Sequence, residues 1–273
     1  MDLKTLKTTP PWDWPESAAR VLLEAMSDRN LPDAERIVAA ELAGDFTVAD
    51  EQIAEVLLSV VGDRDESNAL RSQAAISLGP ALEYADTMGF DDDDDAPLSE
   101  EVYLGVQARL QELFDDDRVP DDVRRSVLEA SVRGPLPWHT EAIERAYASD
   151  NRAWKLTAVF CMRYVRGFEP RILTCLDADN VDIRRQAVVA AGIWELDAAW
   201  SRIEEIIESG DEKPVVLAAI DAAAEIRPHD AEILLASLSD SDDTDIAAAA
   251  WEALATLDGP PTGRNSVPDE LLN

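Results

Sequence analysis

The sequence predicts an all-α protein, an α-solenoid of about seven helix-turn-helix repeats. A similar unit recurs about every 30 residues along the chain, and periods of about 20 to 50 residues are typical of solenoids and propellers. Within each unit the apolar residues follow the helical period rather than the alternation of a strand. Aromatic residues make up only 6% of the chain and alanine is abundant in its second half, which favours closely packed helices over a sheet.

The stretch VDIRRQAVVAAGIWELDAAW, from Val181 to Trp200, contains the second helix of one unit. Its residues Ile183, Ala187 and Trp194 fall on one face of a helix. We use the position after the first apolar residue of this face as the anchor of a unit. The anchors are Arg36, Arg71, Arg124, Lys155, Arg184, Val216 and Ala247. They are 29 to 35 residues apart, except for Arg71 and Arg124, whose spacing of 53 residues indicates an insertion.

A second apolar helix precedes the anchor helix. It is seen in the segments EQIAEVLLSVV, EVYLGVQARLQELF, EAIERAYA, PRILTCL, SRIEEIIE and AEILLASL. The turns between the two helices are rich in aspartate, which caps helix N-termini and interacts favourably with the helix dipole there. Glycine follows the second helix at Gly44, Gly79, Gly134 and Gly167 and predicts its end. Each unit is therefore helix, acidic turn, helix, and neither helix can bury its apolar face alone.

The insertion and the two ends of the chain differ from the repeats. Residues 89–97 contain a glycine, five consecutive aspartates and a proline, and are predicted to form an acidic loop. A calcium loop alternates its acids and has a central glycine, whereas these acids are contiguous, so no metal site is predicted. Residues 1–15 are predicted to cap the solenoid, residues 16–258 to form it, and residues 259–273, which are rich in helix breakers, to be a disordered tail.

The formal net charge of −33 restricts the partners of this chain. Binding to a phosphate backbone needs lysine and arginine, and an anionic membrane repels a field of this sign, so neither nucleic acid nor a membrane is expected. Lysine occurs only at positions 4, 7, 155 and 213. Arginine with abundant aspartate suggests a salt-adapted surface or a GC-rich genome, and recognition of a basic partner is the alternative. Two cysteines without metal spacing and the lack of a long apolar stretch predict a cytoplasmic protein. We expect it to be a monomer.

The units DVRRSVLEASVRG and DIRRQAVVAAGIW resemble the HEAT repeat, in the short bacterial form shared with the phycobilin lyases. The resemblance covers residues 16–258, although the last two units lack the arginine. It implies that the aspartate and arginine of successive units form a ladder between neighbouring repeats, here through Asp122, Arg124, Asp182 and Arg184. Because such pairs set the register of repeats, we interpret these residues as structural rather than as a binding site.

Candidate catalytic groups are few. The histidines His139 and His229 lie in separate turns beside prolines, without an acidic partner at motif spacing, and a capping or solvent-exposed role is the simpler interpretation. The chain contains no HExxH, GxSxG, P-loop or CxxC motif. The sequence therefore predicts no enzymatic activity, no cofactor and no bound metal.

The segment AWKLTAVFCMRYVRGFEPR, from Ala153 to Arg171, gathers basic and aromatic residues in an otherwise acidic chain. Arginine and tyrosine are frequent anchors of interfaces, and ion pairs between repeats are the alternative interpretation. The sequence thus predicts a non-catalytic scaffold or adaptor that binds a protein partner along its second helices. The candidate partner-binding residues, placed by their spacing from the anchors, are Gln73, Ser77, Glu129, Arg133, Arg163, Tyr164 and Arg166. The resemblance implies the alternative, a lyase-like protein or chaperone that handles a tetrapyrrole chromophore.

Overall fold

The computed structural model of the chain describes residues 2–90 and 96–257. Every regular element in this part of the chain is a helix, which confirms the all-α prediction. The chain divides into two compact units, unit 1 from Met1 to Val165 and unit 2 from Arg166 to Asn273. The aspartates of the predicted acidic loop and the predicted tail lie outside the described residues.

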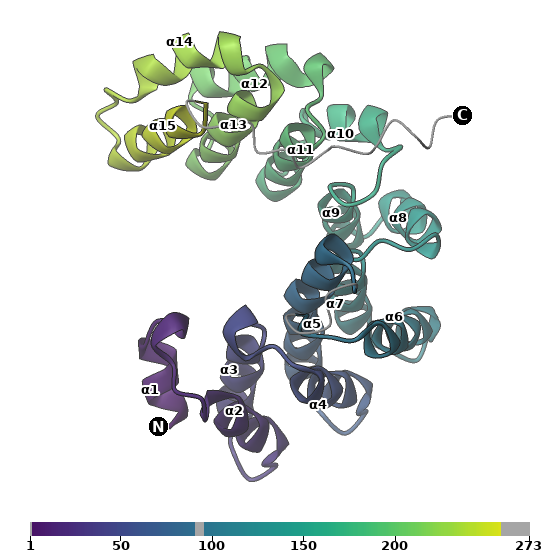
Figure 1. Cartoon of the computed structure of the whole chain (residues 1–273). Helices are drawn as coiled ribbons and strands as arrows, with labels where there is room; N and C mark the ends of the chain where they lie inside the picture. The colour runs from purple at the N-terminus through teal and green to yellow at the C-terminus, as the bar shows by residue number, and fades with distance from the viewer. Residues whose placement is uncertain (1, 91–95, 258–273) are drawn as a thin grey trace. The chain divides into compact units, whose positions relative to one another are not determined.

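Unit 1 begins with a short helical segment and continues as helix pairs (Figure 1). Its elements are α1 (Leu3–Thr8), η1 (Pro11–Asp13), α2 (Ala18–Ser27), α3 (Asp33–Ala43), η2 (Phe46–Val48), α4 (Glu51–Gly62), α5 (Asn68–Met88), α6 (Glu100–Asp115), α7 (Asp121–Ser131), α8 (Trp138–Ala148) and α9 (Arg152–Cys161). Figure 1 shows α4, α6 and α8 in one layer and α3, α5, α7 and α9 in the other. The second helix of each pair therefore lies in a common layer, as the repeat predicts.

Unit 2 follows the same pattern. Its elements are α10 (Glu169–Cys175), α11 (Val181–Ile193), η3 (Asp197–Ala199), α12 (Trp200–Ser209), α13 (Lys213–Ile226), α14 (Pro228–Leu238) and α15 (Thr244–Leu257). The second helices pack in sequence, α11 on α13 and α13 on α15. A Cβ placed on Gly192 of α11 would lie 2.9 Å from the Cα of Ala222 in α13. Small residues at the contact therefore let these helices approach closely.

The anchor arginines cap the C-terminus of the first helix of their own unit. Three of them donate a hydrogen bond from Nε to the carbonyl oxygen of the second-to-last residue of the preceding helix. These bonds join Arg36 to Met26 (3.0 Å), Arg71 to Val61 (2.9 Å) and Arg124 to Phe114 (2.8 Å). The last carbonyls of a helix have no partner inside it, and a cation is favourable at that end of the helix dipole. The recurrence of arginine is therefore explained by a capping role within each unit.

The ladder implied by the resemblance exists at some junctions only. Arg36 also donates to Glu66 of the next unit (2.8 Å), and Arg184 donates to Asp211 of the next unit (2.6 and 3.0 Å). Arg124 instead has loose contacts with two carboxylates of its own unit, Asp117 at 3.3 Å and Asp121 at 3.7 Å. Successive repeats are thus joined by tight ion pairs at the first two of these positions and not at Arg124.

The structure corrects the role implied for two aspartates. Asp122 and Asp182 are exposed, and within the described part of the chain neither forms an ion pair with an arginine. Asp122 accepts a hydrogen bond from the backbone N–H of Val123 (3.1 Å). Both aspartates stand in the first turn of their helix, where a negative charge is favourable. Both stabilise the start of the second helix, and the charge of Asp122 also interacts with Arg71 of the preceding unit.

Helix α5 continues past its predicted end at Gly79. It spans 21 residues and contains Pro80, and a proline inside a helix costs about 3 kcal/mol. The turns beyond the proline bury Leu82 and Ala85 completely, and α5 packs against both α3 and α7. Because this burial offsets the cost of the proline, the helix extends and adds Glu83 to the layer of second helices.

Candidate functional site

A cluster of charged and aromatic side chains lies on the second-helix layer of unit 1. It consists of Glu83 in α5, Glu129 in α7, Arg133 just after α7, and Arg163 and Tyr164 just after α9; we call it the arginine–tyrosine cluster. Helix α7 packs against both α5 and α9, which brings these residues together. Charge interactions join Glu129 to both arginines and Tyr164 to Glu83.

The Arg133 side chain crosses α5 at Gly79 and binds Glu83. Its Nη1 donates a hydrogen bond to the Glu83 Oε2 at 3.0 Å. A Cβ on Gly79 would lie 2.7 Å from both the Cδ and the Nε of Arg133, so the glycine leaves the space that the arginine occupies. The Arg133 Nε is buried and has no hydrogen-bond partner among the described residues. Packing on α5 therefore holds Arg133 in place together with its ion pair.

Arg163 is stacked on two aromatic rings. Its Cζ lies 3.9 Å from the ring centroid of Phe160 and 5.3 Å from that of Tyr164, within the range of cation–π contacts. Burial lowers the pKa of Arg163 and raises the pKa of Tyr164, but an arginine stays charged at neutral pH. Within the described part of the chain Arg163 has no ion pair. Stacking therefore fixes the position of the Arg163 guanidinium, and none of its N–H groups is hydrogen-bonded to a carboxylate of the described residues.

Glu129 is a half-buried carboxyl group beside these arginines. The Thr157 hydroxyl donates a hydrogen bond to its Oε1 at 2.6 Å. Burial raises the pKa of Glu129, while that hydrogen bond and the charges of Arg125, Arg163 and Arg133 oppose the rise. A carboxyl group with a raised pKa can exchange a proton closer to neutral pH than an exposed glutamate. The cluster therefore combines two fixed cations with a titratable acid.

The structure separates the seven predicted partner-binding residues. Four of them lie in the cluster, namely Glu129, Arg133, Arg163 and Tyr164. Gln73 donates a hydrogen bond to the Ser77 hydroxyl in α5 (3.2 Å), but Ser77 is only 6% exposed. A Cβ on Gly44 would lie 3.0 Å from the Ser77 Cα, so close packing at the end of α3 removes Ser77 from the surface. Arg166 belongs to unit 2, where its Cζ lies 4.3 Å from the ring centroid of Trp194.

Glu83 and Thr157 were not among the site residues predicted from the sequence. Glu83 was missed because the second helix was predicted to end at Gly79, which left residue 83 between that helix and the predicted loop at residues 89–97. The helical spacing of Leu78, Leu82 and Ala85 across the proline is the pattern that indicates a continuous helix. Thr157 is fully buried, and no pattern in the sequence distinguishes it from a packing residue.

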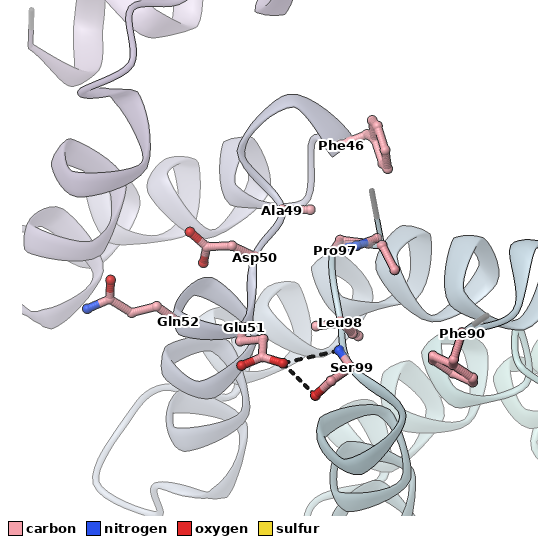
Figure 2. A pocket seen from close by; sticks show the side chains of 10 residues that line it. Phe46, Ala49, Asp50, Glu51, Gln52, Phe90, Pro97, Leu98 and Ser99 are labelled. Atoms are coloured by element: carbon pink, nitrogen blue, oxygen red, sulfur yellow. Dashed lines mark hydrogen bonds between the residues drawn. The ribbon is translucent and has the colours of Figure 1, made fainter. Parts of the chain in front are cut away.

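A second feature of unit 1 is an open hollow of about 580 Å³ beside the start of α4 (Figure 2). It is lined by Phe46, Ala49, Asp50, Glu51, Gln52, Phe90, Ala96, Pro97, Leu98 and Ser99. The Glu51 carboxylate accepts hydrogen bonds from the backbone and the hydroxyl of Ser99 (3.1 and 2.5 Å). Figure 2 shows the Asp50 and Gln52 side chains pointing away from Phe90 and Pro97. The polar groups of the hollow do not converge, so it does not make a chemical site.

The buried histidine serves packing rather than chemistry. His139 is fully buried, and its Nδ1 accepts a hydrogen bond from the Leu136 N–H (2.8 Å), which leaves Nε2 to donate to the Ser131 hydroxyl (3.0 Å). Burial lowers the pKa of His139 to about 4, so the ring is neutral at pH 7. Among the described residues no three potential ligands are grouped around a metal position. None of the described helices combines the length and apolarity needed to cross a membrane.

Comparisons with known proteins gave one kind of match. No family model and no curated protein matches the chain. The chain is similar to the solved structure of the complex of CpcE and CpcF of phycocyanin lyase from Nostoc sp. PCC7120. The two are 17% identical, with 91% of this chain and 98% of that chain covered and a TM-score of 0.44. A likeness at this level assigns neither an activity nor a partner to the chain, and the HEAT assignment stays a resemblance.

The prediction that the chain lacks enzymatic activity is corrected, because the chain is similar to a structure of phycocyanin lyase; this likeness does not assign that activity to the chain. The physical reason is that the prediction rested on the absence of linear motifs. Glu129, half-buried and coupled to Arg163, belongs to no such motif, yet a carboxyl group with a raised pKa is a common proton donor or acceptor. In a fold assembled from repeats, missing motifs do not exclude catalysis.

Proposed function

We propose that the chain binds a protein partner through the arginine–tyrosine cluster of unit 1. The observation that carries the proposal is Arg163, whose guanidinium group is stacked on two rings and has no ion pair in the described part of the chain. The Arg163 guanidinium can therefore donate hydrogen bonds to oxygen atoms of another molecule.

The chemistry of the cluster favours a protein ligand. Arginine and tyrosine contribute most to many interfaces, because they bury a large area and lose few degrees of freedom. The stacking of Arg163 on Phe160 fixes the guanidinium before binding, which lowers the entropic cost of association. Its flat fork of N–H groups fits a carboxylate. The partner therefore presents an acidic side chain to Arg163 and an apolar surface to Tyr164.

Affinity capture from lysate of the host, quantified by mass spectrometry, tests the proposal. The tagged wild-type chain is compared with the double variant Arg163→Gln, Tyr164→Ala. The control is Arg109→Gln, which removes a half-exposed arginine from α6 in the other layer. We expect a stoichiometric partner whose recovery falls at least about tenfold in the double variant, a loss of about 1.4 kcal/mol or more, and is unchanged in the control. Equal recovery with all three chains would exclude the cluster as the binding site.

A tetrapyrrole ligand is the second candidate, implied by the resemblance of the repeats to those of the phycobilin lyases. The feature that favours it is the coupling of Arg133 and Arg163 beside Tyr164, because two cations and a ring suit a planar pigment that carries carboxylates. Titration of the wild-type chain with a free bilin, followed by visible absorbance, tests it. A saturable spectral shift that Arg163→Gln abolishes would support this function, and an unchanged spectrum would remove it.

A further inference from the structure

A smaller pocket, of about 180 Å³, opens where the last turns of α6 and α8 meet the first turns of α7 and α9. Its lining residues are Phe114, Arg124, Arg145, Ala146, Ser149 and Trp154. It is separate from the arginine–tyrosine cluster, which is formed at the other end of α7 and α9. No step of the proposed function uses this pocket.

Aromatic rings and guanidinium groups share the walls of the pocket. The Phe114 and Trp154 ring centroids are 6.1 Å apart and the rings are nearly perpendicular, at 80°. The Cζ of Arg124 lies 5.6 Å from the Phe114 centroid and 5.7 Å from the Trp154 centroid, and the Cζ of Arg145 lies 5.2 Å from the Phe114 centroid. Two cations therefore meet at one apolar surface, in a chain where cations are scarce.

Arg124 differs from Arg36 and Arg184, the anchor arginines that form ion pairs with the next repeat. Arg36 is bound by Glu66, and its side chain is 6% exposed. Glu66 stands five residues before the next anchor, Arg71. The residue at the same distance before Lys155, the anchor that follows Arg124, is Asp150. Asp150 is exposed and forms no ion pair with any described residue, while Trp154 lies against the guanidinium. Arg124 thus lacks the ion pair with the next repeat that Arg36 forms with Glu66.

The geometry points to a site for a single-ring aromatic carboxylate, with its carboxylate on Arg124 and Arg145 and its ring against the partly exposed Trp154. A guanidinium group binds a carboxylate through two parallel hydrogen bonds. A cavity of about 150 Å³ is large enough for benzene, so this pocket has room for one substituted ring. The ligand carboxylate takes the place that Glu66 holds at Arg36.

The charges that surround the pocket are consistent with such a ligand. Arg145 contacts Asp115 at 3.3 Å, and Arg124 contacts Asp117 at 3.3 Å and Asp121 at 3.7 Å. These aspartate side chains are all more than half exposed, so water and salt screen them. A carboxylate inside the pocket interacts with the arginines at closer range and is screened less. It displaces loose contacts rather than a buried ion pair.

Isothermal titration of the full chain with benzoate at physiological salt tests the site. We expect saturable one-to-one binding with a dissociation constant below about 1 mM, which corresponds to about 4 kcal/mol. Benzyl alcohol, which keeps the ring without the charge, and acetate, which keeps the charge without the ring, should each bind at least about tenfold more weakly. Equal binding of benzoate and benzyl alcohol, or no saturation by benzoate below about 10 mM, would overturn the proposal.

Two variants locate the binding within the pocket. Arg145→Gln removes an arginine that is half exposed and is expected to weaken benzoate binding about tenfold. Leu70 stands before the anchor Arg71 as Trp154 stands before Lys155, so Trp154→Leu should preserve packing. The loss of ring contacts should weaken benzoate binding about fivefold. Arg109→Gln is the control, and circular dichroism verifies folding. Unchanged affinity in the Arg145 variant would place any binding elsewhere and refute the site.

Discussion

Two equivalent positions of the repeat are surrounded by charges of opposite sign in α7 and in α13. Glu129 and Asp221 each stand five residues after the anchor of their unit, and Arg133 and Glu225 stand nine residues after it. Burial raises the pKa of both carboxyl groups. Arginines oppose the rise at Glu129, whereas Glu252 and Glu225 reinforce it at Asp221. The repeat determines where a side chain lies, and its neighbours determine what it can do.

This difference separates a surface suited to recognition from one that repels its own charges. Around Glu129 of α7 the acid and the arginines, Arg163 included, compensate one another, and Arg163 has no ion pair in the described part of the chain, so it can bind an external acid. The charges that act on Asp221, those of Glu225 in α13 and Glu252 in α15, are both negative, and like charges at close range destabilise the folded state. Acidification, charge reversal and changes in local packing should each expose this contrast.

Acidification should distinguish the units most strongly, through His139 of unit 1. Its folded pKa of about 4 lies below the usual 6.5, so its contribution to stability is complete above pH 6.5 and is lost as the pH falls toward 4. The loss over that window is about 3 kcal/mol. Urea unfolding at several pH values measures it. We expect His139→Gln to be less stable at pH 7 and to lose less on acidification, and parallel pH profiles would contradict this assignment.

Charge reversal should exchange the character of the two surfaces. Arg133→Glu gives α7 the acid that α13 has at the same position, and we expect it to weaken partner binding by about 2 kcal/mol or more, because it removes the ion pair with Glu83 and repels an acidic partner. Glu225→Arg makes the opposite change in α13 and should leave partner binding unchanged. Affinities are measured by surface plasmon resonance with the captured partner. Equal losses in the two variants would show that net charge, and not the cluster, drives binding.

Removal of one charge from α13 should stabilise unit 2. The raised pKa of Asp221 means that its charged form is unfavourable in the folded state, so this cost is present above the folded pKa and disappears as the pH falls through it. Asp221→Asn should therefore raise the free energy of unfolding by about 0.5 kcal/mol at pH 7 and by less in acid. Glu208→Gln, an exposed change of equal charge in α12, is the control. A gain of the same size in the control would contradict the local repulsion.

The smallest effect on stability is expected at Gly79. Gly79→Ala favours the helix by up to about 1 kcal/mol but displaces Arg133 from its position over α5, so the net change should stay within about 0.5 kcal/mol while partner binding weakens. Gly105→Ala in α6 meets nothing within 4 Å and should show the full helical gain with unchanged binding. Thermal unfolding and partner affinity of both variants are compared. Unchanged affinity of the Gly79 variant would mean that the position of Arg133 does not matter.

The sequence was sufficient for the helix pairs and insufficient for what joins them. Periodic apolar residues predict the second helices, and the spacing from the anchors places Glu129 and Arg133 on one surface. The capping bond from Arg124 to Phe114 was not predictable, because it depends on where the first helix ends. The extension of α5 was missed because the burial of Leu82 outweighs a proline, and tertiary packing of this kind leaves only a weak local pattern.

Exposure was the least predictable property of the candidate site. Ser77 stands six residues after its anchor and Glu129 five residues after its own; the first is covered by the end of α3, and the second is half-buried beside arginines. Local spacing gives the face of a helix on which a residue lies, but the distance to the neighbouring helix decides whether that face is open. This distance is set by small residues such as Gly44, whose effect is visible only in the packed structure.

Hydrogen exchange of the full chain with and without its captured partner tests the central claim most directly. Peptides that contain residues 129–133 and 157–164 should be protected by the partner, and peptides from α13 and α15 should not change. Protection confined to α13 and α15, or to the first-helix layer formed by α4, α6 and α8, would contradict recognition through the arginine–tyrosine cluster.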